Sequence, residues 1–286
     1  MQLLLFKTLW GHTGTLKEAF SLARDAGFNG IEAPVPADDK TFEIFAAQLN
    51  ESGFDWIQEI CTAGSYVPRR GASMAEHLED FEQKLRRGKD IGARFANVMG
   101  GCDAWDIDDS VRFFSEAQNI ADRLTVTCSF ETHRGRSFFS PWNTSKILRR
   151  LPELKITCDF SHWVVVCESL LDEAWDIISQ VARQAHHIHG RVGYDQGPQV
   201  PHPAAPEYRE ALAFHQRCWE TIWKEQRDRS YAQSTLTPEF GPDGYLHTLP
   251  FTGAPIADLW EINRWIGATE RDHFQRFSHN TMQQIA

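Results

Sequence analysis

The chain has 286 residues, 42% of them hydrophobic, and a formal net charge of −10 at pH 7. That length and apolar content suit one large core and fall in the usual range of a single α/β barrel. An acidic protein lacks the basic face that binding to phosphates requires, so we expect no nucleic-acid partner. The N-terminal run MQLLLFKTLWG is too short for a signal peptide and has no basic segment before it. No apolar stretch reaches the roughly 18 residues of a membrane helix, so we expect a cytoplasmic protein without membrane contact.

Strand-like runs alternate with amphipathic helical stretches along the whole chain. The predicted strands are 3–8, 30–33, 54–61, 94–99, 125–131, 155–159, 186–190 and 234–239. The predicted helices are 15–26, 41–52, 74–91, 109–123, 144–151, 170–183, 207–224 and 257–274. This alternation predicts a parallel sheet closed into a (β/α)8 TIM barrel of the α/β class, as one domain over residues 1–286. An open doubly wound sheet is the alternative, but LWGHTGT after the first strand is not a GxGxxG turn.

Each of the last four predicted strands ends at a side chain that can bind a metal ion. Successive side chains along a strand point to opposite faces of the sheet. Counting back from Glu131 separates a polar face from an apolar face, and the same holds for the strands that end at Asp159, His189 and Glu239. Polar inner faces that end in acids or a histidine predict a polar site inside a closed barrel.

Three carboxylates and one imidazole form an oxygen-rich, moderately hard ligand set. Such a set suits Mn²⁺, Mg²⁺ or Co²⁺, and it also accommodates Zn²⁺. The six cysteines are scattered without a CxxC pair, which favours reduced thiols over disulfides or a structural zinc cage. We therefore expect one divalent cation as cofactor. A cation that chelates a carbonyl and its neighbouring hydroxyl stabilises an enediolate, and Glu131 and Glu239 could then be both ligands and catalytic acid–base groups.

The sequence resembles the xylose-isomerase-like barrel superfamily of sugar isomerases, epimerases and related enzymes. The pieces that carry this resemblance are GFNGIEAP at 27–34, FETHRG at 130–135, DFSH at 159–162, HIHGRVG at 187–193 and TPEFGP at 237–242. They cover nearly the whole chain and are specific for the superfamily, but not for one reaction. The resemblance implies that Glu131, Asp159, His189 and Glu239 ligate one divalent cation, and that His162 contacts substrate oxygens.

The same resemblance directs attention to the loop after the seventh strand. In members that epimerise ketoses, an arginine in this loop binds the substrate. Here Asp195 stands in the expected stretch, and Arg191 is the nearer basic candidate for substrate binding. This departure puts a simple free-ketohexose epimerase in doubt.

Other polar and aromatic residues fall near the predicted strand ends. His133 and Asn97 are candidates for contact with the substrate, and Trp105 could stack on a sugar ring. Glu59 is a further candidate, although alternation alone does not decide whether it faces the site or pairs with a basic neighbour. His187 has the inward parity of its strand but lies one layer deeper, so we expect a hydrogen-bonded residue of the barrel interior.

The sequence leaves more than one reaction open. The first is a metal-dependent isomerase or epimerase acting on a ketose, aldose or sugar derivative, and the second is a lyase or dehydratase, for instance one that performs β-elimination on a 3-keto-glycoside. An apurinic endonuclease would need additional histidines, which EICTAGS, NVMGGCD and GRVGYD do not contain. A metal-free sugar-binding barrel is a fourth reading. We expect a small carbohydrate as the ligand, and a homodimer or homotetramer as the assembly.

Overall fold

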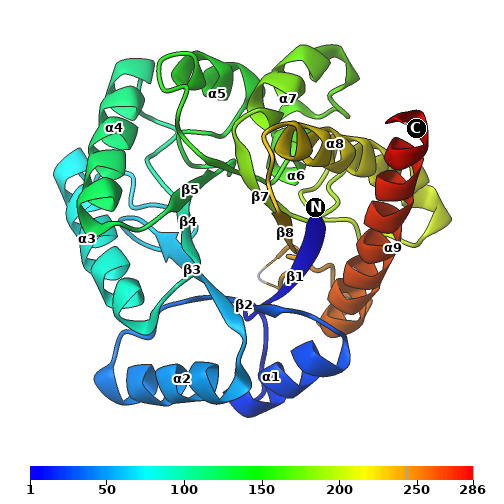
Figure 1. The fold of residues 1–286 in the computed structure, drawn as a ribbon, viewed down its shortest axis with the longest axis horizontal. Coiled ribbons are helices and arrows are strands. Elements are labelled where there is room, and N and C mark those ends of the chain that lie inside the picture. Colours follow the sequence, from blue (N-terminus) through cyan, green and yellow to red (C-terminus); the bar gives the residue numbers. More distant parts are fainter. Residues whose placement is uncertain (243, 286) are drawn as a thin grey trace.

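The computed structural model describes residues 1–242 and 244–285, and within them eight parallel strands form a closed barrel in sequence order, with β8 paired to β1 (Figure 1). The strands are β1 (Gln2–Thr8), β2 (Gly30–Pro34), β3 (Asp55–Cys61), β4 (Phe95–Met99), β5 (Cys128–Glu131), β6 (Ile156–Cys158), β7 (Ala185–His189) and β8 (Gln233–Thr237). The predicted (β/α)8 TIM barrel is therefore confirmed.

Helices surround the barrel on its outer face (Figure 1). They are α1 (Leu16–Asp25), α2 (Asp39–Ser52), α3 (Met74–Ile91), α4 (Ile107–Leu124), α5 (Pro141–Leu148), α6 (Ser161–Cys167), α7 (Trp175–Ala182), α8 (Arg209–Asp228) and α9 (Leu259–Ile285), with short 3₁₀ turns η1 (Asp172–Ala174) and η2 (Pro206–Tyr208). Among the described residues, none of these helices combines the length and the apolar composition needed to span a bilayer.

Most element bounds shift by a few residues from the sequence prediction, and two of the differences have a clear local reason. Strand β5 begins at Cys128 rather than at residue 125, because Thr125 ends α4 in the left-handed region with φ 55°. Helix α6 was not predicted, because it is only 7 residues long and its N-cap, Phe160, makes no side-chain hydrogen bond. Its apolar residues also show no helical spacing. Helix α6 begins two residues after Asp159, so it belongs to the loop region that shapes the site.

The barrel interior is apolar at one end and polar at the other. Leu4, Phe6, Ile57 and Phe95, at most 5% exposed, form a separate buried cluster. The ring of Phe95 packs edge-on against His187, with ring centroids 5.3 Å apart, so the polar layers begin directly above this cluster. The larger apolar core lies between the strands and the surrounding helices. This division leaves the carboxyl ends of the strands as the polar end of the barrel, where TIM-barrel sites occur.

Candidate metal centre

Four potential metal ligands meet at the carboxyl end of the barrel. Glu131 and His189 are the last residues of β5 and β7, and Asp159 and Glu239 lie just past β6 and β8. All four are buried, none more than 5% exposed. One ligand atom from each of the four lies within 4.8 Å of the others. The structure thus brings together the four residues whose inward faces the sequence predicted.

The ring of His189 is turned so that its Nδ1 faces the carboxylates. Nδ1 lies 2.9 Å from Oε2 of Glu239 and 3.5 Å from Oε1 of Glu131. Within the described residues, neither His189 Nδ1 nor Glu131 Oε1 makes a hydrogen bond, although both are buried and lie close to other polar atoms. Buried polar atoms are almost always paired, so two unpaired atoms that face each other are what the ligands of an ion would look like.

The electrostatics of the cluster also fit a cation. Burial and the negative charges of Glu239, Glu32 and Glu131 raise the pKa of Glu59, on β3, to about 8. Burial disfavours a charged ring at His189, but the carboxylates of Glu239, Glu32 and Glu131 outweigh it and raise the pKa of His189 well above its usual value. Such shifts report an excess of negative charge, which a divalent cation would offset. The residues present therefore fit a divalent cation.

Arg191 supplies positive charge at the edge of this cluster. Its buried guanidinium donates from Nη2 to Asp159 Oδ2 at 2.5 Å and to His162 Nε2 at 2.6 Å, and Nη2 lies 3.5 Å from Glu239 Oε2. Its Nε donates to Ser161 Oγ at 3.1 Å. Arg191 thus contacts two of the four ligand candidates and ties them to the start of α6.

The two histidines predicted to contact substrate lie side by side. The rings of His133 and His162 have centroids 3.9 Å apart. Burial lowers the pKa of each well below its usual value, and the positive charge of Arg191 adds to the effect on both. Both rings are therefore neutral at pH 7, where a neutral imidazole can donate one hydrogen bond and accept another. His162 Nδ1 has no partner among the described residues.

A small cavity of about 40 Å³ adjoins the cluster. It is lined by Trp10, Glu59, Tyr66, Met99, Glu131, His133, Arg191, Glu239 and Tyr245. The Trp10 ring centroid lies 5.1 Å from that of Tyr245 and 6.3 Å from that of Tyr66, so the loops after β1, β3 and β8 cover the cavity with aromatic rings. The cavity is therefore narrow, and these rings form part of its wall. Tyr66 and Tyr245 were not predicted, since nothing in the sequence distinguishes them from other loop aromatics.

Asn97 and Trp105, two of the predicted substrate contacts, are not among the residues that line the small cavity. Asn97 points to the ligands rather than to the cavity, because its Nδ2 donates to Glu131 Oε2 at 2.9 Å. Trp105 is not among the residues that line the cavity. Its ring packs against His77 and Phe113, with centroid distances of 4.8 and 5.5 Å, because the chain has already turned outward into α4. The expected stacking of Trp105 on a sugar has no support in this geometry.

Glu32 is a buried acid at this site that the sequence reading did not single out. Burial opposes its ionisation, but the positive fields of His189 and His187 hold the pKa of Glu32 well below its usual range. The expected interior role of His187 is observed, since its Nδ1 lies 2.7 Å from Thr235 Oγ1. The signals for Glu32 were its place as a lone acid in the apolar strand GIEAP and within GFNGIEAP, one of the pieces that carry the family resemblance.

A larger cavity, of about 830 Å³, lies between the loop after β1 and the start of α9. It shares Trp10 with the small cavity, and the buried Lys7, whose pKa burial lowers to about 8, lies on its wall. Among the described residues, none of the candidate metal clusters includes a residue of this cavity. The ligand chemistry is therefore concentrated in the smaller cavity, at the barrel centre.

Comparison with known proteins identifies the family. The profile described as xylose isomerase-like TIM barrel matches residues 20–197. The chain belongs to this family. No curated protein matches its sequence.

Solved structures agree with this assignment at the level of the fold. L-ribulose 3-epimerase superposes with a TM-score of 0.67 at 13% identity, over 100% of this chain and 99% of the other. A probable 3-DHS dehydratase from Bacillus anthracis gives a TM-score of 0.59 at 15% identity, over 94% and 99%. A xylose isomerase-like TIM barrel protein from Mycobacterium smegmatis in complex with magnesium gives 0.61 at 11% identity, over 94% and 97%. Proteins described as an epimerase and as a probable dehydratase therefore share this barrel fold.

Proposed function

We propose that the protein is a divalent-metal-dependent isomerase or epimerase that acts on a ketose, an aldose or a sugar derivative by removing a proton next to a carbonyl. The observation that carries this proposal is the cluster of Glu131, Asp159, His189 and Glu239, whose ligand atoms lie within 4.8 Å of one another. Its place at the carboxyl ends of the strands, where barrel enzymes bind substrates, supports the same proposal. A sugar epimerase and a dehydratase among the similar structures are consistent with proton abstraction.

The four residues of the cluster would hold one Mn²⁺, Co²⁺, Mg²⁺ or Zn²⁺ ion, with His189 contributing its Nδ1. When bound, such an ion would polarise a carbonyl and the neighbouring hydroxyl, which makes the C–H of the hydroxyl-bearing carbon more acidic. Three carboxylates favour the harder ions of this group.

Two carboxylates can exchange protons with a substrate from different directions. Glu131 comes from β5 and is held by Asn97 through Oε2, whereas Glu239 follows β8, and both line the cavity. An epimerase needs a base on one side of a carbon and an acid on the other, and this pair supplies both. We assign substrate binding to Arg191, His162, His133 and Glu59.

A lyase or dehydratase that uses the same proton abstraction is the second candidate. One observation favours it: the only arginine that the loop after β7 brings to the site is Arg191, and its Nη2 is already bonded to Asp159 and His162. A substrate that must lose a group next to the enolised position needs no second arginine, since elimination requires only the base and an acid for the leaving group.

Proton exchange in D₂O tests both candidates. Two samples of the protein, one loaded with Mn²⁺ and one with Mg²⁺, are incubated with ketoses, aldoses and 3-keto-glycosides. The Mg²⁺ sample is diamagnetic and is therefore suited to NMR. Exchange of the C–H next to the carbonyl supports the proposal, and the product separates the epimerase from the lyase. Absence of exchange with every member, in protein that holds one metal per chain, would refute both.

A matched pair of variants ties the exchange to the site. Glu239→Gln keeps the volume of the side chain and removes a charged ligand and base, so it should abolish exchange while the protein stays folded. Glu153→Gln, at an exposed position, makes the same chemical change outside the cluster and should exchange like the wild type. Equal rates in both variants would contradict the assignment of Glu239.

A further inference from the structure

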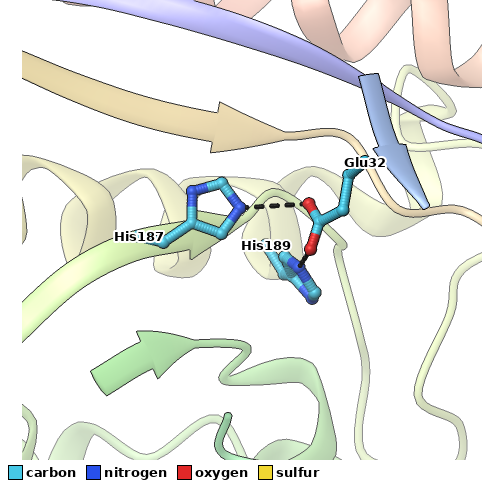
Figure 2. A group of neighbouring side chains, drawn as sticks. All are labelled: Glu32, His187 and His189. Carbon is cyan, nitrogen blue, oxygen red and sulfur yellow. Dashed lines mark hydrogen bonds and ion pairs between the residues drawn. The ribbon is translucent and has the colours of Figure 1, made fainter. Parts of the chain in front are cut away.

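The carboxylate of Glu32 lies between two histidines of a strand that is not its neighbour. Figure 2 shows Glu32, from β2, facing His187 and His189, both from β7. Oε1 lies 3.0 Å from His189 Nε2, and Oε2 lies 3.2 Å from His187 Nε2. Glu32 is 1% exposed, and both histidines are fully buried. Each oxygen of this carboxylate therefore contacts a different histidine ring.

Hydroxyl groups of β8 hold this arrangement in place. Thr237 donates from Oγ1 to Glu32 Oε2 at 2.5 Å, and Thr235 Oγ1 lies 2.7 Å from Nδ1 of His187. Both threonines are buried, at 0% and 5% exposed. A buried polar network in which each member is bonded has little freedom to rearrange, so the carboxylate of Glu32 occupies a fixed position.

That position determines which nitrogen of His189 faces the ligand cluster. A carboxylate oxygen is only an acceptor, so the contact with Glu32 keeps a hydrogen on Nε2. Asn97 Nδ2 lies 3.3 Å from the same nitrogen but donates to Glu131 at 2.9 Å. The ring is thereby oriented with Nδ1 toward Glu131 and Glu239. In metal sites the ligating histidine commonly donates its second N–H to a carboxylate, which fixes its orientation.

We infer that Glu32 is a positioning residue for the metal centre: it orients the ring of His189 so that Nδ1 can bind the cation. This inference rests on the proposed function, because it takes His189 to be a metal ligand. Glu32 does not line the small cavity, so it acts through His189 and not on the substrate. Glu32, His187 and His189 also have the spacing of a metal-binding cluster of their own. The test must therefore distinguish a positioning role of Glu32 from a role as a metal ligand.

The test measures metal affinity rather than turnover. Glu32→Gln keeps the size of the side chain but removes its negative charge, and its NH₂ group can no longer accept a hydrogen bond from one of the two histidines. Mn²⁺ titrated by calorimetry should bind wild-type protein with one ion per chain and should bind Glu32→Gln about 10–100-fold more weakly, as for other residues that orient a ligand. The visible absorption of bound Co²⁺ should shift in the variant, because the orientation of His189 changes.

A matched control comes from the outer layer of the protein. Glu270 in α9 is fully buried, and its Oε2 lies 2.8 Å from Nδ1 of His273. Glu270→Gln therefore also replaces a buried carboxylate that contacts a histidine, but away from the metal centre. It should bind Mn²⁺ like the wild type. If Glu32→Gln does not fold, Glu32→Asp retains the charge and withdraws the carboxylate by one methylene, and it should weaken binding in the same direction.

The outcomes separate the inference from the function on which it rests. Wild-type protein that binds no divalent cation refutes the proposed function. Wild-type protein that binds one ion, with unchanged affinity and Co²⁺ spectrum in the Glu32 variants, refutes only the positioning role. Two ions in the wild type and one in Glu32→Gln would also overturn it, because Glu32 would then be a ligand itself.

Discussion

Replacement of Arg136 by methionine should destabilise the barrel by about 3 kcal/mol. Arg136 follows β5 and is fully buried. Its guanidinium donates to the backbone carbonyls of Thr62 at 2.7 Å, Gly101 at 3.3 Å and Tyr66 at 3.1 Å, and also to that of Ser65. Burial lowers the pKa of Arg136 to about 10, so the side chain remains charged at neutral pH. One cation thus joins the loops that follow β3 and β4.

The magnitude follows from which acceptors remain buried. Ser65 and Tyr66 are exposed or partly exposed, so water can replace the arginine at their carbonyls. Thr62 and Gly101 are buried, and each carbonyl left without a donor costs about 1–3 kcal/mol. Removal of a buried charge recovers part of that loss, which leaves a net destabilisation of about 3 kcal/mol. The function should suffer too, because Tyr66 covers the small cavity.

Urea unfolding followed by tryptophan fluorescence measures this effect. With a slope of about 2 kcal/mol per M, a loss of about 3 kcal/mol lowers the midpoint by roughly 1.5 M. Arg149→Met, at an exposed position, is the matched control and should change the stability by less than about 0.5 kcal/mol. If Arg136→Met lowers the free energy of unfolding by less than about 1 kcal/mol, the carbonyl groups bonded to Arg136 find other donors and the reasoning is wrong.

Three further results are expected. A Cβ at Gly241 would lie 2.0 Å from the ring of Trp10, so Gly241→Ala should displace this ring and raise KM several-fold. An unchanged KM would mean that Trp10 does not contact the substrate. Burial opposes the charge on His273, but its hydrogen bonds and charge interactions with Glu270 and Glu220 raise its pKa. The stability that this group contributes is therefore complete below about pH 6.5 and disappears as the pH rises through its folded-state pKa. The fall in Tm over that pH range should be smaller in His273→Gln than in the wild type. Curves of Tm against pH with the same shape in both proteins would show that the charge on His273 does not contribute to stability. Removal of bound metal with EDTA should lower Tm, and Mn²⁺ at about 100 times its Kd should restore about 2.7 kcal/mol of stability, whereas a Tm indifferent to both would argue against a metal site.

The sequence by itself determined the barrel and the inward direction of the strand-end ligands. Both follow from short-range periodicity, since each strand–helix unit carries its own apolar pattern and alternation along a strand decides which side chains face inward. Closure of the ring then brings Glu131, Asp159, His189 and Glu239 to one end of the barrel, and no longer-range information is needed to place them there.

Other features were decided only by the tertiary structure. The contact between Glu32 and His189 joins residues 157 positions apart, and it depends on the register of every strand between them. The bond between Arg191 and Asp159 depends on the path of the loop after β7, and the packing of Trp105 on His77 depends on how α3 and α4 lie against the barrel. Strand periodicity states which face a side chain takes but not which partner it meets, because partners across a closed barrel are chosen by register, loop path and packing.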